Sequence, residues 1–82
     1  MSSIANHRKE LETFSFLAYR LEVARQKHPN FADNAADAWD AIESELLELY
    51  EAINHESEDR QFDEAVDVAV TAIRFILGEY KK

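Results

Sequence analysis

The chain has 82 residues with a formal net charge of -8 at pH 7, and it contains no cysteine. This length predicts a single domain over residues 1–82, whose small core has no disulfide bonds to stabilise it. The negative charge argues against nucleic acids and anionic membrane surfaces as partners, because both are negatively charged themselves.

The N-terminal residues, Met1–Ile4, lack the basic segment and apolar run of a secretory signal peptide. No apolar run in the chain approaches the roughly 20 residues that a membrane-spanning helix needs. We therefore expect a cytoplasmic protein.

Helices should form most of the chain, because one glycine and one proline are too few for the turns of a β-rich fold. The first helix is predicted from Asn6 to His28, with apolar residues at helical spacing on two sides. One side carries Leu11, Phe14, Leu17, Ala18, Leu21 and Ala24, and the other carries Phe16, Tyr19 and Val23. Pro29 ends this helix, since proline cannot continue the hydrogen-bond ladder.

The second helix is predicted from Ala35 to His55, with Asp33, Asn34 or Asp37 as its N-cap. Its apolar residues have the spacing of a seam in a helical bundle. They are Trp39, Ile42, Leu46, Leu49 and Ile53.

The third helix is predicted from Arg60 to Glu79, capped by Ser57 or Asp59 and terminated at Gly78. Its broad apolar face comprises Phe62, Ala65, Val66, Ala69, Ile73, Ile76 and Leu77. The first and third helices are thus too apolar for one neighbour each, and a monomer would expose the excess to water. The sequence predicts an all-α fold of three main helices, a small bundle completed by self-association, most often as a twofold dimer.

Two pairs of acidic residues are the candidate site. Glu45 and Glu48 lie three positions apart in the second helix, and Glu64 and Asp67 lie three apart in the third. This spacing puts each pair on one face of its helix. If the two helices pack antiparallel, four carboxylates can meet, and they favour a hard divalent cation such as Mg²⁺ because they repel one another without it.

An alternative interpretation is that these acids lie on solvated helix faces, which is common in a chain with 17 acidic residues. The neighbours of the acids favour a packed site instead. Small residues that would admit another helix share the side of Glu45 and Glu48, namely Ala38, Ala41 and Ala52. Val68 and Phe75 flank the acids of the third helix. Spacing and neighbours together leave both interpretations open.

The order of the acids, Glu45-x-x-Glu48, fifteen residues, then Glu64-x-x-Asp67, resembles the motif of the MazG-like all-alpha nucleoside triphosphate pyrophosphohydrolases. The likeness covers about Trp39 to Phe75, nearly half the chain. It implies a MazG-like helical bundle assembled as a homodimer or homotetramer. It also implies cleavage of a (deoxy)nucleoside triphosphate between the α and β phosphates, giving a monophosphate and pyrophosphate, as in cleaning of the nucleotide pool.

The resemblance assigns roles to single residues. Glu45, Glu48, Glu64 and Asp67 would hold Mg²⁺, for which Mn²⁺ can substitute, and the metal would polarise the phosphates and activate a water. Glu45 or Glu48 would orient that water as a base. Ser44 departs from the motif, because the family often has a further acid at that place, and this departure puts water activation or a second metal in question.

Two further interpretations follow from this departure and from the charge. A non-catalytic binding module of the same fold would keep the helices and lose the activity. An enzyme similar to phosphoribosyl-ATP pyrophosphohydrolases is less favoured, because few basic residues are present for a second phosphate group. Arg74 is a candidate phosphate contact and Trp39 a candidate base contact; pairing of Arg74 with a glutamate and packing of Trp39 in the core are the alternatives.

Overall fold

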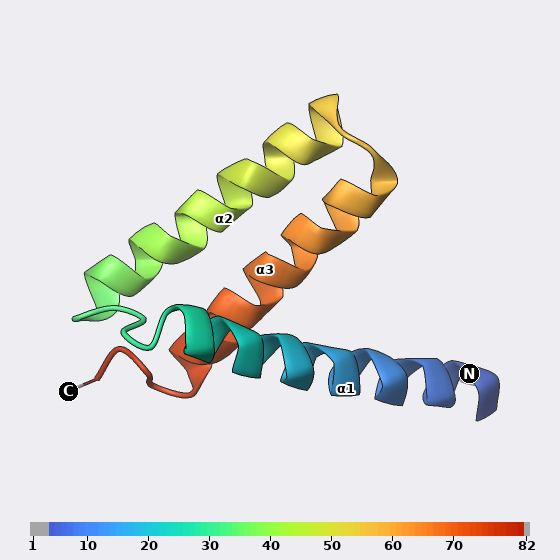
Figure 1. The fold of residues 1–82 in the computed structure, drawn as a ribbon, viewed down its shortest axis with the longest axis horizontal. Helices are drawn as coiled ribbons and strands as arrows, with labels where there is room; N and C mark the ends of the chain where they lie inside the picture. The colour runs from blue at the N-terminus through green and yellow to red at the C-terminus, as the bar shows by residue number, and fades with distance from the viewer. Residues whose placement is uncertain (1–3, 82) are drawn as a thin grey trace.

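The computed structural model describes residues 4–81, which form three α-helices: α1 (Ile4–Lys27), α2 (Ala35–His55) and α3 (Glu58–Ile76) (Figure 1). No strand occurs within these residues, so the predicted all-α class is confirmed. The observed bounds of α2 are the predicted ones. The helix α3 both begins and ends earlier than predicted, for reasons that lie in its caps.

Side-chain caps set the starts of α2 and α3. The Asn34 side chain accepts a hydrogen bond from the Asp37 N–H at 2.9 Å, and the Ser57 hydroxyl accepts one from the Arg60 N–H at 3.4 Å. Each bond satisfies a backbone donor that the first turn of a helix leaves free. Asn34 and Ser57 are both among the N-caps predicted from the sequence.

A glycine ends α3. Gly78 has a φ of 74°, its N–H donates to the Phe75 carbonyl at 2.9 Å, and the Glu79 N–H donates to the Arg74 carbonyl at 3.0 Å. These two bonds form a Schellman motif, which needs the left-handed conformation at the glycine. Gly78 is therefore the predicted terminator, and the helix ends at Ile76.

Replacing Gly78 by alanine is expected to lower the free energy of unfolding by about 1–2 kcal/mol, the usual cost of a left-handed L-residue. An added Cβ would meet only the Lys81 side chain, at 3.5 Å or more, so the cost comes from the backbone and not from crowding. Urea denaturation measures it. Gly78→Asn should lose less, because asparagine tolerates this conformation better, and an alanine variant as stable as the wild type would contradict the prediction.

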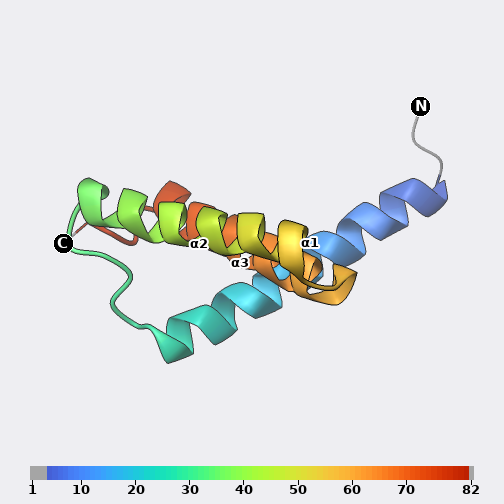
Figure 2. The same ribbon diagram turned by 90° about the horizontal axis from the view of Figure 1, so that it is seen from above.

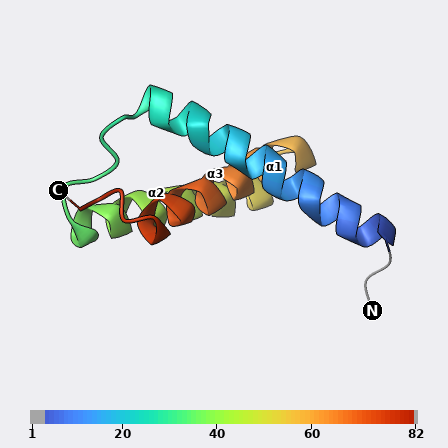
Figure 3. The same ribbon diagram turned by 90° about the horizontal axis from the view of Figure 1, so that it is seen from below.

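The helices α2 and α3 form an antiparallel hairpin, and α1 packs against α3 alone (Figures 1 and 2). Within residues 4–81, no Cα atom of α1 lies within 8 Å of α2. The N-terminal half of α1 extends beyond the hairpin, and the segment after α3 returns beside the loop that joins α1 to α2 (Figure 3).

Small residues hold the hairpin together. Ala38 and Ala52 of α2 are completely buried against α3, and Val66 and Val70 of α3 are the other buried hydrophobic residues. Alanines let the two backbones approach closely, as their position beside the acids predicts. No large side chain in the described part of the chain is fully buried, so the core of one chain is small.

The predicted seam of α2 is only partly buried within the chain, because Ile42 and Leu49 are half-buried and the other three members are exposed. Trp39, Leu46 and Ile53 are 53%, 42% and 57% exposed. The reason is that α2 turns its alanine and glutamate side toward α3, which leaves the bulky stripe about 100° round the helix. Despite this surface, the described helices lack the combination of length and apolarity that crossing a bilayer requires.

Candidate metal and phosphate site

The antiparallel hairpin brings three of the four predicted acids together. Glu45, Glu48 and Glu64 each offer a carboxylate oxygen, and these three oxygens lie within 4.8 Å of one another. Glu45 and Glu48 come from the side of α2 that faces α3, and Glu64 comes from the facing side of α3. We call these three residues the carboxylate cluster.

Two oxygens of the cluster have no hydrogen-bond partner. Glu64 is 6% exposed and Glu45 is half-buried, and the Oε2 atom of each is buried without a partner among the described residues. A buried acceptor left in this way costs about 1–3 kcal/mol. The cluster thus combines three close carboxylate oxygens with two buried acceptors, which either a proton or a cation could satisfy.

Burial and crowding raise the pKa values of the cluster. The pKa of Glu45 is raised to about 7, mainly by burial, then by the adjacent Glu48 carboxyl and by the charges of Asp67 and Glu64. The pKa of Glu64 is also raised, mainly by burial and then by the charges of Glu48 and Asp67, and Arg60 offsets part of this. Without a cation, the folded chain therefore favours protonated carboxyls here.

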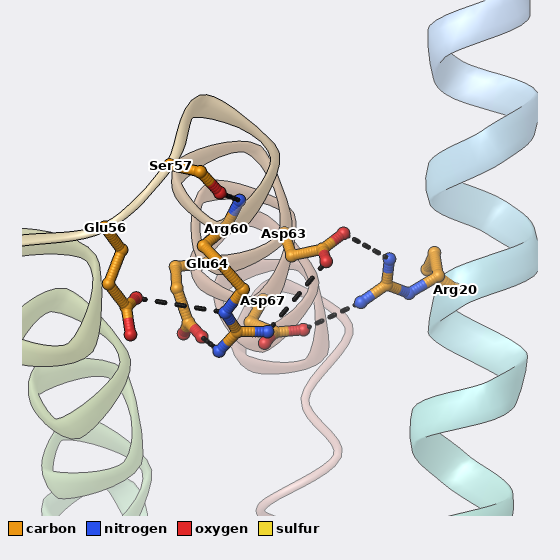
Figure 4. A network of polar contacts seen from close by, with 7 residues as sticks. All are labelled: Arg20, Glu56, Ser57, Arg60, Asp63, Glu64 and Asp67. Carbon is orange, nitrogen blue, oxygen red and sulfur yellow. Dashed lines mark hydrogen bonds and ion pairs between the residues drawn. The ribbon is translucent and has the colours of Figure 1, made fainter. Parts of the chain in front are cut away.

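Asp67 lies at the edge of the cluster, because an arginine of α1 holds it. Arg20 Nη2 donates to Asp67 Oδ1 at 3.1 Å, and Arg20 Nη1 lies 3.7 Å from Asp63 Oδ1 (Figure 4). The charge of Asp67 still raises the pKa of Glu45 and of Glu64. The structure thus places Asp67 close enough to act on the cluster electrostatically, with its carboxylate already paired.

Arg60 contacts the cluster at the end nearest the α2–α3 turn. Its Nη2 donates to Glu64 Oε1 at 2.7 Å, and its guanidinium lies 3.8 Å from Glu56 and 4.0 Å from Asp63 (Figure 4). The Arg60 side chain is 54% exposed, so it can swing into solvent. Arg60 supplies positive charge to an acidic site that would otherwise have none on this side.

A cleft of about 440 Å³ adjoins the cluster on its other side. It lies between α1, α2 and α3, within the size range of small-ligand sites. Four of its lining residues are basic: Arg20, Lys27, His28 and Arg74. Glu45 and Asp67 line it as well, so Glu45 belongs to both the cleft and the cluster. Basic side chains next to carboxylates that could share a cation are an arrangement suited to a polyphosphate.

The basic side chains of the cleft differ in whether an acidic side chain already pairs with them. Lys27 has no ion-pair partner within residues 4–81, whereas Arg20 is held by acids of α3. Arg74 is 4% exposed, donates from Nε to Glu79 at 2.7 Å, and lies over the Phe31 ring at 4.9 Å. The predicted alternative for Arg74, pairing with a glutamate, is what the structure contains, although the arginine is buried and not on the surface.

Trp39 is not among the residues that line the cleft. Its exposed position also contradicts the alternative that it packs in the core of the chain. Ser44, in contrast, lines the cleft beside Glu45. Within the cleft, the Ser44 hydroxyl can donate or accept a hydrogen bond but cannot act as a carboxylate base.

Arg20, Lys27 and Arg60 were not singled out from the sequence. A signal for the first two exists, because Arg20 and Lys27 follow Phe16 and Val23 along the second apolar side of α1. A cation on an apolar side is unusual and indicates a charged partner.

Comparison of the chain with protein-family models, with curated proteins and with solved structures gave no match, so these geometric features carry the functional argument.

Proposed function

We propose that this chain is a Mg²⁺-dependent nucleoside triphosphate pyrophosphohydrolase, which cleaves the bond between the α and β phosphates. The observation that carries the proposal is the carboxylate cluster, with its two unpartnered buried oxygens, opening through Glu45 into a cleft lined by basic side chains. An acidic protein can hold a polyphosphate in such a place, because a cation and local basic groups offset the charge of the phosphates.

The donor set of the cluster fits Mg²⁺, which prefers carboxylate oxygens and keeps ligand positions for phosphates and water. Glu45, Glu48 and Glu64 would hold the ion, with Asp67 beside them, and Mn²⁺ accepts the same donors. When bound, the ion supplies the positive charge that polarises phosphate oxygens.

The residues of the cleft have separate tasks in this proposal. Lys27 and His28 bind phosphate oxygens, since neither is committed to an acid of the described chain. Glu45 orients the attacking water, because it is the member of the cluster that also lines the cleft. Ser44 lies beside Glu45 and donates a hydrogen bond to a phosphate oxygen or to that water.

A non-catalytic binding module is the second candidate, and two observations favour it. Ser44 stands in the cleft where the family motif often has an acid. Arg60 already contacts Glu64 and so covers part of the cluster. In this alternative, the cluster and the cleft bind a metal–nucleotide complex without cleaving it.

The first experiment is to measure pyrophosphate release from canonical ribo- and deoxyribonucleoside triphosphates with Mg²⁺ and then with Mn²⁺. Wild-type turnover that Glu64→Gln abolishes would support the hydrolase and identify its nucleotide. Metal-dependent nucleotide binding without turnover would favour the binding module. If the metal neither raises the melting temperature nor promotes nucleotide binding, both forms of the proposal fail.

Replacing Arg60 by glutamine is expected to tighten Mn²⁺ binding about two- to fivefold. An exposed ion pair is worth about 0–1 kcal/mol, and its arginine must leave Glu64 when a metal binds there. Isothermal titration measures the affinity. The matched control is Arg8→Gln, which removes the same charge from the exposed surface of α1, and equal effects of the two variants would show that only net charge matters.

A further inference from the structure

Glu79 lies just past the end of α3 and binds two arginines at once. Its Oε1 atom accepts a hydrogen bond from Arg74 Nε of α3 at 2.7 Å, and its Oε2 atom accepts bonds from Nε of Arg25, at 2.8 Å, and from Nη2 of the same residue. The Glu79 side chain is 19% exposed. One carboxylate thus joins the C-terminal ends of α1 and α3, two of the helices that form the cleft.

The turn after α3 fixes the position of this carboxylate. The left-handed conformation of Gly78 turns the chain back, and the Glu79 N–H donates to the Arg74 carbonyl at 3.0 Å. The next side chain, Tyr80, stacks on Phe75 with ring centroids 4.8 Å apart. This segment lies beside the loop that joins α1 to α2 (Figure 3). Glu79 is therefore held by its own backbone and by the ring that follows it.

Arg74, the α3 partner of Glu79, belongs to the cleft. It is 4% exposed and lines the cleft, and its guanidinium lies 4.9 Å from the centre of the Phe31 ring, which also lines the cleft. Arg74 follows Asp67 by seven residues, so the two lie on nearly the same side of α3, about 10 Å apart along its axis. A ligand that extends from the carboxylate cluster along the cleft would therefore meet Arg74.

The way in which Arg74 pairs with Glu79 leaves it able to bind a phosphate. A guanidinium has five N–H donors, and Glu79 accepts from the single one on Nε. The end of the guanidinium, with its two terminal nitrogens, is an edge that matches two oxygens of a phosphate. Pairing with a glutamate and contact with a phosphate are alternatives for Arg74 in the sequence, and this geometry allows both.

We propose that Glu79 is a positioning residue for phosphate binding, which holds Arg74 against Phe31 with the end of its guanidinium available to the cleft. This inference rests on the proposed function, because it needs a phosphate-bearing ligand in the cleft. Glu79 is not among the residues that line the cleft, so it acts through the arginine. Arg25 anchors the same carboxylate to α1.

Two physical effects make such a residue useful. A long side chain loses rotamer freedom when it binds a ligand, and an arginine that is already held in place loses less. The group of Glu79, Arg25 and Arg74 also keeps a net positive charge, which favours an anion nearby. The hydrogen bonds from Arg25 and then from Arg74 lower the pKa of Glu79 although burial raises it, so the carboxylate is charged at neutral pH.

The test is a double-mutant cycle on the binding of inorganic triphosphate with Mg²⁺, measured by isothermal titration. Glu79→Gln and Arg74→Gln should each weaken binding about tenfold, the scale of a hydrogen bond to a charged group. Because Glu79 acts through Arg74, Glu79→Gln should add less than about twofold to the loss in Arg74→Gln. The matched control is Glu22→Gln, since Glu22 bonds Arg25 at 3.0 Å from the exposed surface of α1, and it should bind like the wild type.

Two further measurements separate positioning from a structural role. Mn²⁺ alone should bind Glu79→Gln as tightly as the wild type, and in nucleotide turnover this variant should raise KM and leave kcat nearly unchanged. If Glu79→Gln or Arg74→Gln loses its helical signal, Arg25→Gln replaces it. This variant frees one side of the Glu79 carboxylate and should weaken triphosphate binding about two- to fivefold, the scale of a partly exposed ion pair.

The outcomes distinguish this inference from the proposed function. Losses that add in the double variant, an equal loss in Glu22→Gln, or a parallel loss of Mn²⁺ affinity would overturn the positioning role of Glu79. So would a wild type that cleaves nucleotides but does not bind inorganic triphosphate. A wild type that neither binds triphosphate nor releases pyrophosphate would overturn the proposed function and this inference together.

Discussion

Replacing Glu48 by glutamine is expected to reduce pyrophosphate release by about 10²–10³-fold, because a bound metal contributes several kcal/mol of charge stabilisation and each 1.4 kcal/mol is about tenfold in rate. Glu48 is exposed and takes part in the cluster through one oxygen. The amide keeps the size of the side chain and removes its charge. The rise in melting temperature with Mg²⁺ should disappear in the same variant.

The matched control is Glu43→Gln. Glu43 is an exposed acid of α2 five residues before Glu48, on a side of the helix away from the cluster, and its replacement makes the same change in net charge. Turnover and metal response should stay at the wild-type level. Equal losses in both variants would mean that the acids act only through overall charge, and unchanged turnover in Glu48→Gln would remove Glu48 from the site.

Local signals account for the parts of the fold that the sequence predicts. Helix starts depend on side chains a few residues away, so Asn34 and Ser57 can be recognised as caps. The same holds for Gly78, whose missing Cβ is the reason that it ends α3. The carboxylate pairs follow from spacing as well, because residues three apart on a helix share a face.

Long-range contacts could not be predicted from these signals. Arg20 meets Asp67 across 47 positions in sequence, and no spacing rule connects them. This ion pair explains why Asp67 stands apart from the cluster although its interval from Glu64 equals that of the other pair. Arg74 is a similar case, since its bond to Glu79 depends on the turn after α3.

The apolar stripe of α2, which contains Trp39 and Leu46, shows a different limit of prediction from sequence. Its spacing predicts an apolar contact but does not say whether the neighbour belongs to the same chain or to another. Within the chain, Ala38 and Ala52 are the residues of α2 that are fully buried, because small side chains allow the closest approach of α3. The bulky stripe with Trp39 and Leu46 is then left exposed in the single chain.

In the absence of metal, the free energy of unfolding is expected to fall as the pH rises from about 5 to about 8. The pKa of Glu45 is about 7 in the folded chain, against an ordinary value of 4.5. Between these values the unfolded chain loses its proton first, so it binds fewer protons than the folded chain and stability decreases with pH. The raised pKa of Glu64 adds to the same trend.

The lowered pKa of Glu79 makes the free energy of unfolding depend on pH in the opposite direction, and in a more acidic pH range. Arg25 and Arg74 hold this carboxyl in its charged form. The stability that it contributes is present above its ordinary pKa and is lost as the pH falls through the lowered value. Stability without metal should therefore be greatest in mildly acidic solution, between the ranges governed by Glu79 and by Glu45.

Glu45→Gln is expected to remove much of the decrease between pH 5 and pH 8 and to stabilise the metal-free chain at pH 8 by on the order of 1 kcal/mol. Each pKa unit corresponds to about 1.4 kcal/mol, and partial solvent access to Glu45 reduces the full value. Urea denaturation in EDTA at constant protein concentration measures the change. Glu43→Gln should keep the wild-type slope, and a Glu45→Gln chain with that same slope would show that Glu45 ionises normally in the folded state.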